Sequence, residues 1–235
     1  MKLSLFIISL VLWTSWVFAE EPARAWMAGA EAGVLLTRGN TDTDSVNTKV
    51  TVENDRERWR HRFGAVYLSA SDQGAATAEK TSASVNSEYK MGDLDYLFAV
   101  LRAEGDRFSG YSALSTESAG YGRRFIAGDR AILETEAGAG ARQTHFVDGS
   151  RRNEGIVRLG AKAVCRFSAG SELREEAFSE ISKDNIHTES VTSLKSRVNG
   201  NLSMKLSVSA VHNSRVPPGI KKTDTVTAMT LVFDY

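Results

Sequence analysis

The chain has little cysteine, little proline and few long apolar runs. It contains one cysteine and three prolines, and no apolar run after residue 19 is long enough to cross a bilayer as a helix. The single Cys165 excludes an internal disulfide, and the missing runs exclude a bundle of transmembrane helices. The 29 basic and 29 acidic residues give a net charge of zero. The basic excess of a nucleic-acid-binding protein is therefore absent, and we expect no nucleic-acid partner.

The first residues have the features of a secretory signal peptide. Lys2 precedes an apolar run that reaches Trp13, and the segment closes on the small residue Ala19. The run is shorter than the roughly 20 residues that span a bilayer, so we predict a signal peptide over 1–19 rather than an anchor. Cleavage is expected after Ala19, or otherwise near Ala25.

Residues 20–235 alternate between apolar and polar with a period of two, which is the period of a β-strand. The last segment shows this best, because Met229, Leu231, Phe233 and Tyr235 share one face. Turn-forming residues divide the chain into about twelve such segments, and short turns alternate with long loops. Outer-membrane barrels have this layout, with short periplasmic turns and long external loops. We therefore predict an all-β fold, an antiparallel up-and-down transmembrane barrel with both termini on the periplasmic side.

The expected strand boundaries follow from the turn residues. Two segments are weak, because Glu175 and Glu189 fall on their thin apolar faces, so about ten strands is the alternative. The expected long loops are 38–44, 71–78, 105–112, 144–153, 182–187 and 213–222. The expected strands are 26–37, 45–53, 59–70, 79–90, 94–104, 113–125, 131–143, 155–167, 172–181, 187–197, 202–212 and 224–235.

A soluble periplasmic β-sandwich would also alternate, but two features favour the barrel. The apolar face is thin and rich in alanine, and the opposite face carries charged side chains in the middle of most strands. Closure into a barrel would also leave no edge strand unpaired. Aromatic residues near the strand ends fit the girdles that mark a membrane interface, namely Trp26, Trp59, Tyr67, Tyr89, Tyr96, Phe125 and Phe167.

Five segments carry a resemblance to a known family. They are Thr37-Arg38-Gly39-Asn40-Thr41-Asp42-Thr43, Arg58-Trp59-Arg60-His61, the stretch 101–111, the Pro-Pro segment 213–219 and Thr223-Asp224-Thr225. Together they resemble the salt-induced outer-membrane proteins, a domain-of-unknown-function family of Gram-negative bacteria. The resemblance covers nearly all of the mature chain and implies an outer-membrane barrel. It supplies no reaction, substrate or catalytic residue, and the link to salt comes from the family name alone.

The end of the chain points to partners in the membrane. Met229, Leu231, Phe233 and Tyr235 resemble the C-terminal signature that the barrel-assembly machinery reads. Export and assembly would also involve periplasmic chaperones, and the finished barrel would contact outer-membrane lipid and lipopolysaccharide. We expect a monomer located in the cell outer membrane.

The charged face of the strands is the candidate functional surface. Ion pairs that satisfy a closed interior are one interpretation, because buried charges must be paired. The other is a water-filled, charge-lined passage. The predicted lumen-lining residues are Glu31, Lys49, Glu53, Arg60, Arg62, Glu88, Lys90, Arg102, Glu104, Glu134, Glu136, Arg158, Lys162, Arg166 and Lys205.

Other groups of residues give weaker indications of chemistry. The loop 40–44 spaces oxygen ligands like the start of a calcium loop but lacks the rest of that motif, and we expect no metal or cofactor. The loop 106–111 is expected to pack on the barrel mouth. A hydrolase would need a nucleophile near His145, His187 or His212, and no serine motif marks one, so no catalytic residue is expected. We favour an envelope-adaptation barrel with a narrow or plugged lumen, with a diffusion channel and an outer-membrane hydrolase as alternatives.

Overall fold

The computed structural model describes residues 26–38, 43–72, 75–106, 111–216 and 221–234, and excludes the side chains of 34–46 and 70–78. The predicted signal peptide, most of the calcium-like loop, residues 107–110 and Tyr235 lie outside this part of the chain. The described residues form twelve strands, β1 (Trp26–Arg38), β2 (Thr43–Asp55), β3 (Trp59–Asp72), β4 (Ala75–Lys90), β5 (Asp95–Asp106), β6 (Tyr111–Ala127), β7 (Ala131–Phe146), β8 (Arg151–Ser168), β9 (Ser171–Ile181), β10 (Ile186–Asn199), β11 (Leu202–Asn213) and β12 (Thr223–Asp234).

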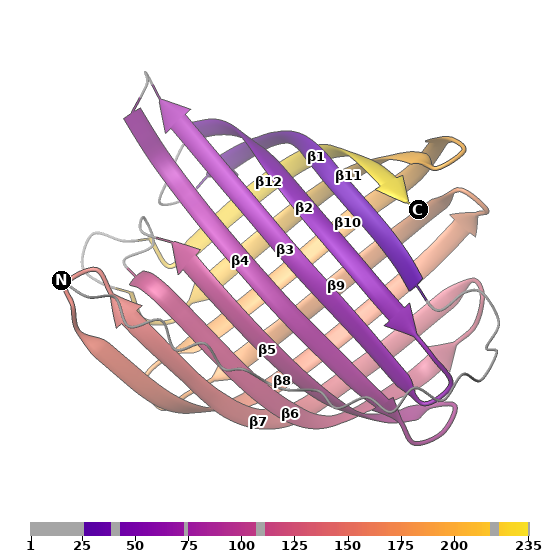
Figure 1. Ribbon diagram of the computed structural model, residues 1–235, viewed down its shortest axis with the longest axis horizontal. Coiled ribbons are helices and arrows are strands. Elements are labelled where there is room, and N and C mark those ends of the chain that lie inside the picture. The colour runs from indigo at the N-terminus through magenta and orange to yellow at the C-terminus, as the bar shows by residue number, and fades with distance from the viewer. Residues whose placement is uncertain (1–25, 39–42, 73–74, 107–110, 217–220, 235) are drawn as a thin grey trace, which may run out of the picture.

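The strands form one closed antiparallel barrel in chain order, and β1 pairs with β12 to complete the ring (Figure 1). The predicted fold and the count of twelve strands are confirmed, including the weak segments that became β9 and β10. No helix in the described part of the chain is long and apolar enough to cross a membrane. Gly29 of β1 pairs with Asp234 of β12, so the described chain begins and ends at the same end of the barrel. We call this end the turn end and the other the loop end.

The connections at the loop end are shorter than predicted. Only residues 73–74 separate β3 from β4, and β8 begins at Arg151 instead of 155. The prediction of six long loops was wrong because polar residues continue the strands past the apolar band, where cross-strand pairing satisfies their backbone groups. The connection 214–222, between β11 and β12, is the one that stays long. At the turn end, Gly200 adopts a φ of 45°, as the tight turn between β10 and β11 requires.

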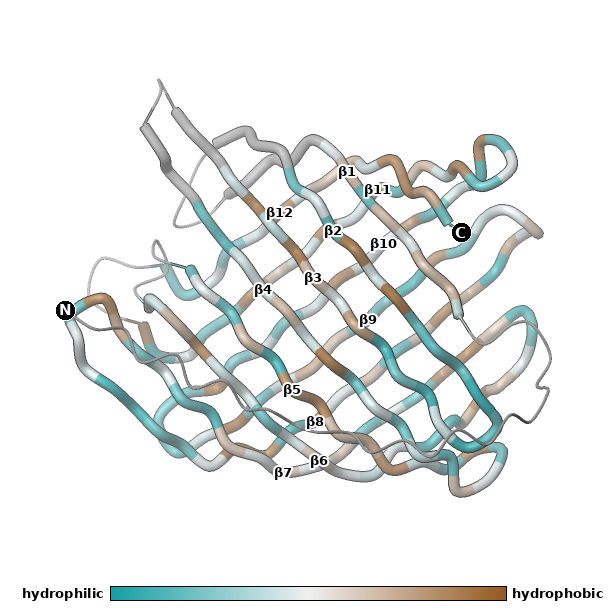
Figure 2. The backbone as a smooth tube through the Cα atoms, viewed as in Figure 1, coloured by the Kyte–Doolittle hydropathy of each residue, from teal (hydrophilic) through white to brown (hydrophobic). Residues whose placement is uncertain are grey.

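Side chains alternate between an apolar outer face and a polar interior. Leu97, Leu101, Val208 and Leu231 are exposed on the outside of the barrel, as are most other large apolar residues. Among the described residues, buried polar and charged side chains outnumber buried apolar ones. The colours alternate along the strands in Figure 2 for the same reason. An apolar exterior around a charged interior is the arrangement that a bilayer favours and that water disfavours.

Aromatic residues gather on the outer face at the turn end. Trp26, Phe125 and Phe167 are among the most exposed side chains, and Trp59 packs against Tyr89 with ring centroids 5.0 Å apart. This fits the predicted girdle at a membrane interface. Tyr96 was wrongly assigned to the girdle. It lies on the inward face of β5 and is the most completely buried large side chain among the described residues.

Candidate functional site in the barrel lumen

The structure places every predicted lumen residue on the inward face of its strand. Each of them alternates with outward-facing neighbours, as Lys49 does between the exposed Thr48 and Val50. Several inward residues that the prediction omitted complete the set. Sequence alternation could have found most of them, since they occupy inward positions on predicted strands, namely Lys80, Tyr96, Arg124, Arg142, Glu176, Phe178 and Glu180. Asp55 lay in a predicted turn, and Glu189 was assigned to the other face of its strand.

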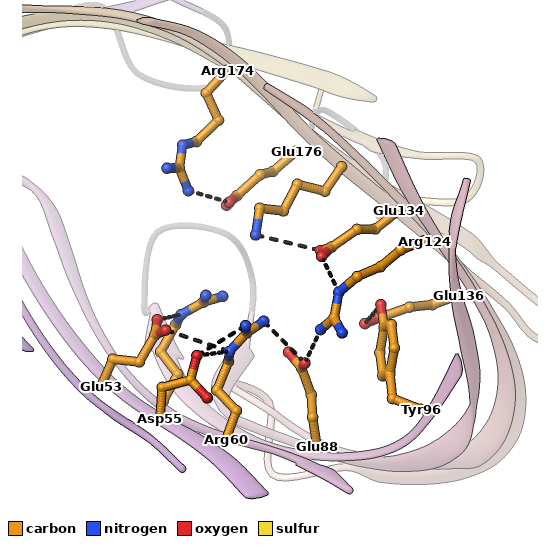
Figure 3. Close-up of polar contacts among 12 residues, drawn as sticks. Glu53, Asp55, Arg60, Glu88, Tyr96, Arg124, Glu134, Glu136, Arg174 and Glu176 are labelled. Atoms are coloured by element: carbon orange, nitrogen blue, oxygen red, sulfur yellow. Dashed lines mark hydrogen bonds and ion pairs between the residues drawn. The ribbon is translucent and has the colours of Figure 1, made fainter. Parts of the chain in front are cut away.

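A continuous chain of ion pairs runs around one wall near the turn end (Figure 3). Arg60 on β3 bonds to Asp55 on β2 at 3.0 Å and to Glu88 on β4 at 3.3 Å. Arg124 on β6 then links Glu88 at 3.0 Å to Glu134 on β7 at 2.8 Å. Lys162 on β8 completes the chain, 3.4 Å from Glu134. We call this set of alternating charges the turn-side chain.

The turn-side chain passes over an aromatic residue of β5. The Arg124 guanidinium lies 4.8 Å from the centroid of the Tyr96 ring, within the range of a cation–π contact. The Tyr96 hydroxyl donates to Glu136 of β7 at 3.2 Å. The ring itself covers Gly122 of β6, where a Cβ atom would lie 2.2 Å from Tyr96 Cζ. Glycine at this position is therefore what allows the tyrosine to lie flat on the wall.

A second set of ion pairs crosses the lumen nearer the loop end. Arg102 on β5 donates to Glu189 on β10 at 2.8 Å, although β6, β7, β8 and β9 lie between these strands in the ring. The contact can form only through the interior of the barrel. Arg102 also donates to Glu104 at 2.7 Å, and Glu104 accepts from Lys80 at 3.1 Å. We call Arg102–Glu189 the cross-lumen bridge.

An aromatic ring and two further arginines support the cross-lumen bridge. Phe178 of β9 lies 5.4 Å from the Arg102 guanidinium and 4.2 Å from that of Arg158. Glu180, also on β9, accepts from Arg142 at 2.7 Å and from Arg158 at 3.1 Å. Side chains of β5, β7, β8, β9 and β10 thus meet in one layer inside the barrel.

The remaining charged residues pair along the walls or interact across the ring. Lys205 bonds to Glu31, and Arg62 bonds to Glu53 at 2.8 Å. Glu176 of β9 interacts electrostatically with Lys49 of β2, on the far side of the ring. The interior is therefore a network of mutually compensating charges, as a low-dielectric environment requires.

Glu189 is the main correction to the predicted faces. It was assigned to the apolar side of its strand, but it faces the lumen. The pairing of Lys195 with Lys205 sets the register of β10 against β11 and directs the odd-numbered residues of β10 inward. The alternation of β10 was ambiguous because Val191 faces inward and Leu194 outward. Glu175 was assigned to the outer face and lies there.

The histidines do not come together. His187 faces the lumen and bonds to Asn213 at 3.1 Å, whereas His212 bonds to Thr223 at 2.8 Å on the outer face. His145 is exposed on the outside of β7. Within the described ranges, no cluster of His, Cys, Asp and Glu could hold a metal ion. Tyr111, from the end of the loop 106–111, donates a hydrogen bond to Glu104 inside the barrel.

A closed ring of antiparallel strands, apolar outside and charged inside, defines a transmembrane β-barrel of the outer-membrane type. Residues 30–235 match the family described as "Protein of unknown function, DUF481". The chain belongs to this family.

The chain is similar to other proteins in sequence and in fold. It is 24% identical to the uncharacterised protein YdiY of Escherichia coli (strain K12), over 90% of this chain and 85% of that one. The NanC porin is similar in fold, with a TM-score of 0.60 at 9% identity over 87% of this chain and 98% of that one. An outer-membrane channel from Pseudomonas putida F1 gives a TM-score of 0.54 at 9% identity, over 92% of this chain and 100% of that one.

Proposed function

We propose that this protein is an outer-membrane barrel whose lumen is held narrow by ion pairs and passes only very small solutes, if any. The observation that carries this proposal is the cross-lumen bridge, in which Arg102 and Glu189 meet at 2.8 Å from non-adjacent strands. Phe178 and Arg158 pack beside it and reduce the open cross-section further. A twelve-strand barrel lies between small barrels filled by side chains and wide porins, so side chains of this length decide whether the lumen is open.

The cellular role that we propose is adaptation of the envelope to osmotic or salt conditions. The support is the resemblance to the salt-induced family. In this proposal the chain is exported by a cleaved signal peptide, the C-terminal signature guides its assembly, and the barrel contacts lipid and lipopolysaccharide. It needs no cofactor and has no catalytic role. The purified protein should therefore hydrolyse no lipid, and a hydrolysis that is lost on alanine replacement of His145, His187 and His212 would overturn the last point.

The alternative is a diffusion channel for small solutes. Its support is the charged interior and the likeness in fold to a porin and to an outer-membrane channel. The histidines and serines give no comparable support for a hydrolase.

Conductance of the purified protein in a planar bilayer separates the two functions. A narrow lumen predicts no steady single-channel steps, or only very small ones, in moderate salt. Steady, large open-channel steps in the wild-type protein would overturn the narrow-lumen proposal and support the diffusion channel. Protein heated before reconstitution serves as the control, because the unfolded chain should produce no channel steps of either size.

A further inference from the structure

In the middle of the outer face of β9 and β10, polar side chains stand where the strands on either side carry apolar ones. β8 presents Val157, Leu159 and Phe167 to the outside, and β11 presents Leu206 and Val208. The outward positions of β9 and β10 carry six hydroxyls and one carboxylate, and these form the polar seam, namely Ser171, Glu175, Ser179, Thr188, Ser190, Thr192 and Ser196. The exposed Leu173 and Leu194 separate Ser171 and Ser196 from the other five, and Ile181 and Ile186 follow toward the loop end.

Hydrogen bonds connect the two strands of the polar seam from side chain to side chain. Ser190 donates to Glu175 at 2.6 Å, and Thr192 donates to the other oxygen of the same carboxylate. Ser179 bonds to Thr188 at 2.9 Å. These bonds stay within one chain, yet a carboxylate can accept about four, so Glu175 retains acceptor capacity toward the outside.

The polar seam lies at the depth of the apolar band. Glu175 is paired in register with Ala163 of β8, which sits between the exposed Leu159 and Phe167. On the other side, its partner Thr192 is paired with the exposed Val208 of β11. Lipid chains offer no hydrogen bonds, so a carboxylate and a row of hydroxyls at this depth are unfavourable against lipid.

We propose that the polar seam is the surface through which two copies of this chain associate in the membrane. Both copies must have the same orientation in the bilayer, so their two-fold axis runs along the membrane normal. An axis between β9 and β10 places β9 of each copy against β10 of the other. Glu175 then faces the Thr188, Ser190 and Thr192 hydroxyls of the partner subunit rather than the second carboxylate.

The polar seam is best covered by a second copy of the chain, because the outer faces of β9 and β10 are complementary to each other. The outward positions of β10 carry no charge, whereas β9 carries a single carboxylate. A hydroxyl both donates and accepts hydrogen bonds, so the hydroxyls of β10 can bond to hydroxyls of a second copy and also to its Glu175. Serine and threonine side chains form hydrogen bonds of this kind between the helices of other membrane proteins. This inference does not depend on whether the lumen conducts, and it replaces the monomer expected from the sequence.

Cysteine cross-linking in intact outer membranes tests the interface. The native Cys165 is exposed and near β9, so it is first replaced in a Cys165→Ser background. Thr192→Cys then introduces a thiol into the polar seam, and Thr48→Cys introduces a matched thiol at an exposed outward position of β2. A short bismaleimide cross-linker, which can span the offset between the two copies of position 192, should give a covalent product of twice the monomer mass with Thr192→Cys, and much less with Thr48→Cys.

The mass of the detergent-solubilised protein gives an independent readout. Wild type should be dimeric by native mass spectrometry, and Glu175→Leu, which still fits a lipid-facing strand, should shift it toward monomer. Three results would overturn the proposal. They are a wild-type monomer together with no Thr192→Cys product, equal cross-linking at both positions, or a Thr192→Cys product with a different protein.

Discussion

At the scale of single residues, the interior depends on carboxylates that each hold two cations. Glu180 is the most buried of these, and it accepts from Arg142 at 2.7 Å and from Arg158 at 3.1 Å. Replacing it with glutamine keeps the size but leaves both arginines without their counter-charge. We expect Glu180→Gln to lower the free energy of unfolding by about 3 kcal/mol. Urea unfolding of the protein refolded into lipid vesicles would measure the loss.

A carboxylate on the same strand provides the control. Glu172 pairs with Arg166 and Arg174, whose side chains are 39% and 33% exposed. Water can replace these partners, so Glu172→Gln should cost less than about 1 kcal/mol. Equal losses for the two variants would show that burial of the Glu180 pairs contributes nothing specific.

The close approach of Tyr96 to Gly122 makes a second residue-scale prediction. A Cβ atom at Gly122 would lie 2.2 Å from Tyr96 Cζ, and the ring cannot easily move because its hydroxyl is bonded to Glu136. Gly122→Ala is therefore expected to destabilise the barrel by about 1–3 kcal/mol through overpacking. The same unfolding assay measures it.

Gly155 of β8 is the matched control, because a Cβ atom there would meet nothing within 4 Å. Gly155→Ala should leave stability unchanged or raise it slightly, since alanine restricts the unfolded chain. A loss in Gly155→Ala as large as in Gly122→Ala would mean that strand glycines matter for another reason than the tyrosine.

At the scale of the element, alternation predicted the strands well but their ends poorly. β11 was expected at 202–212 and is observed at Leu202–Asn213, because all of its apolar residues from Leu202 to Ala210 fall on even-numbered positions. β10 mixes parities, and only pairing with β11 decides that Glu189 faces inward. Strand ends were harder to predict because residues beyond the apolar band satisfy their backbones by pairing, whatever their polarity.

The depth of an outward position along its strand leads to a prediction about lipid contact. Val208 lies midway along β11 and is exposed, whereas the exposed Val198 lies next to the turn after β10. Val208→Arg should cost about 2–4 kcal/mol and Val198→Arg about 0–1 kcal/mol, because a charge near the interface reaches water. Vesicle unfolding free energies would give both values. Similar values for the two variants would contradict an apolar band of limited height on this face.

At the scale of the whole molecule, the sequence predicted which side chains enter the lumen but not which of them meet. Arg102 was placed inside from the alternation of β5, yet its contact with Glu189 depends on the closure and diameter of the ring. Contacts between neighbouring strands, such as that of Glu134 with Lys162, are ones that hairpin order makes possible to predict. Contacts across the barrel, such as those of Phe178 with Arg102, follow no local pattern and needed the assembled ring.

The cross-lumen bridge supplies the last prediction, because we propose that it narrows the passage. The double variant Arg102→Ala with Glu189→Ala shortens two side chains. It removes both charges of the bridge together, so neither is left without its partner. We expect steady conductance steps in a planar bilayer, severalfold larger than any in the wild type.

The ion pair of Arg215 with Asp184, 3.2 Å apart and 66% and 44% exposed, is the matched control. Its double alanine variant should conduct like the wild type, since exposed side chains do not fill the lumen. If the two double variants conduct alike, Arg102 and Glu189 are not the constriction, and the narrow part of the lumen must lie at the turn-side chain instead.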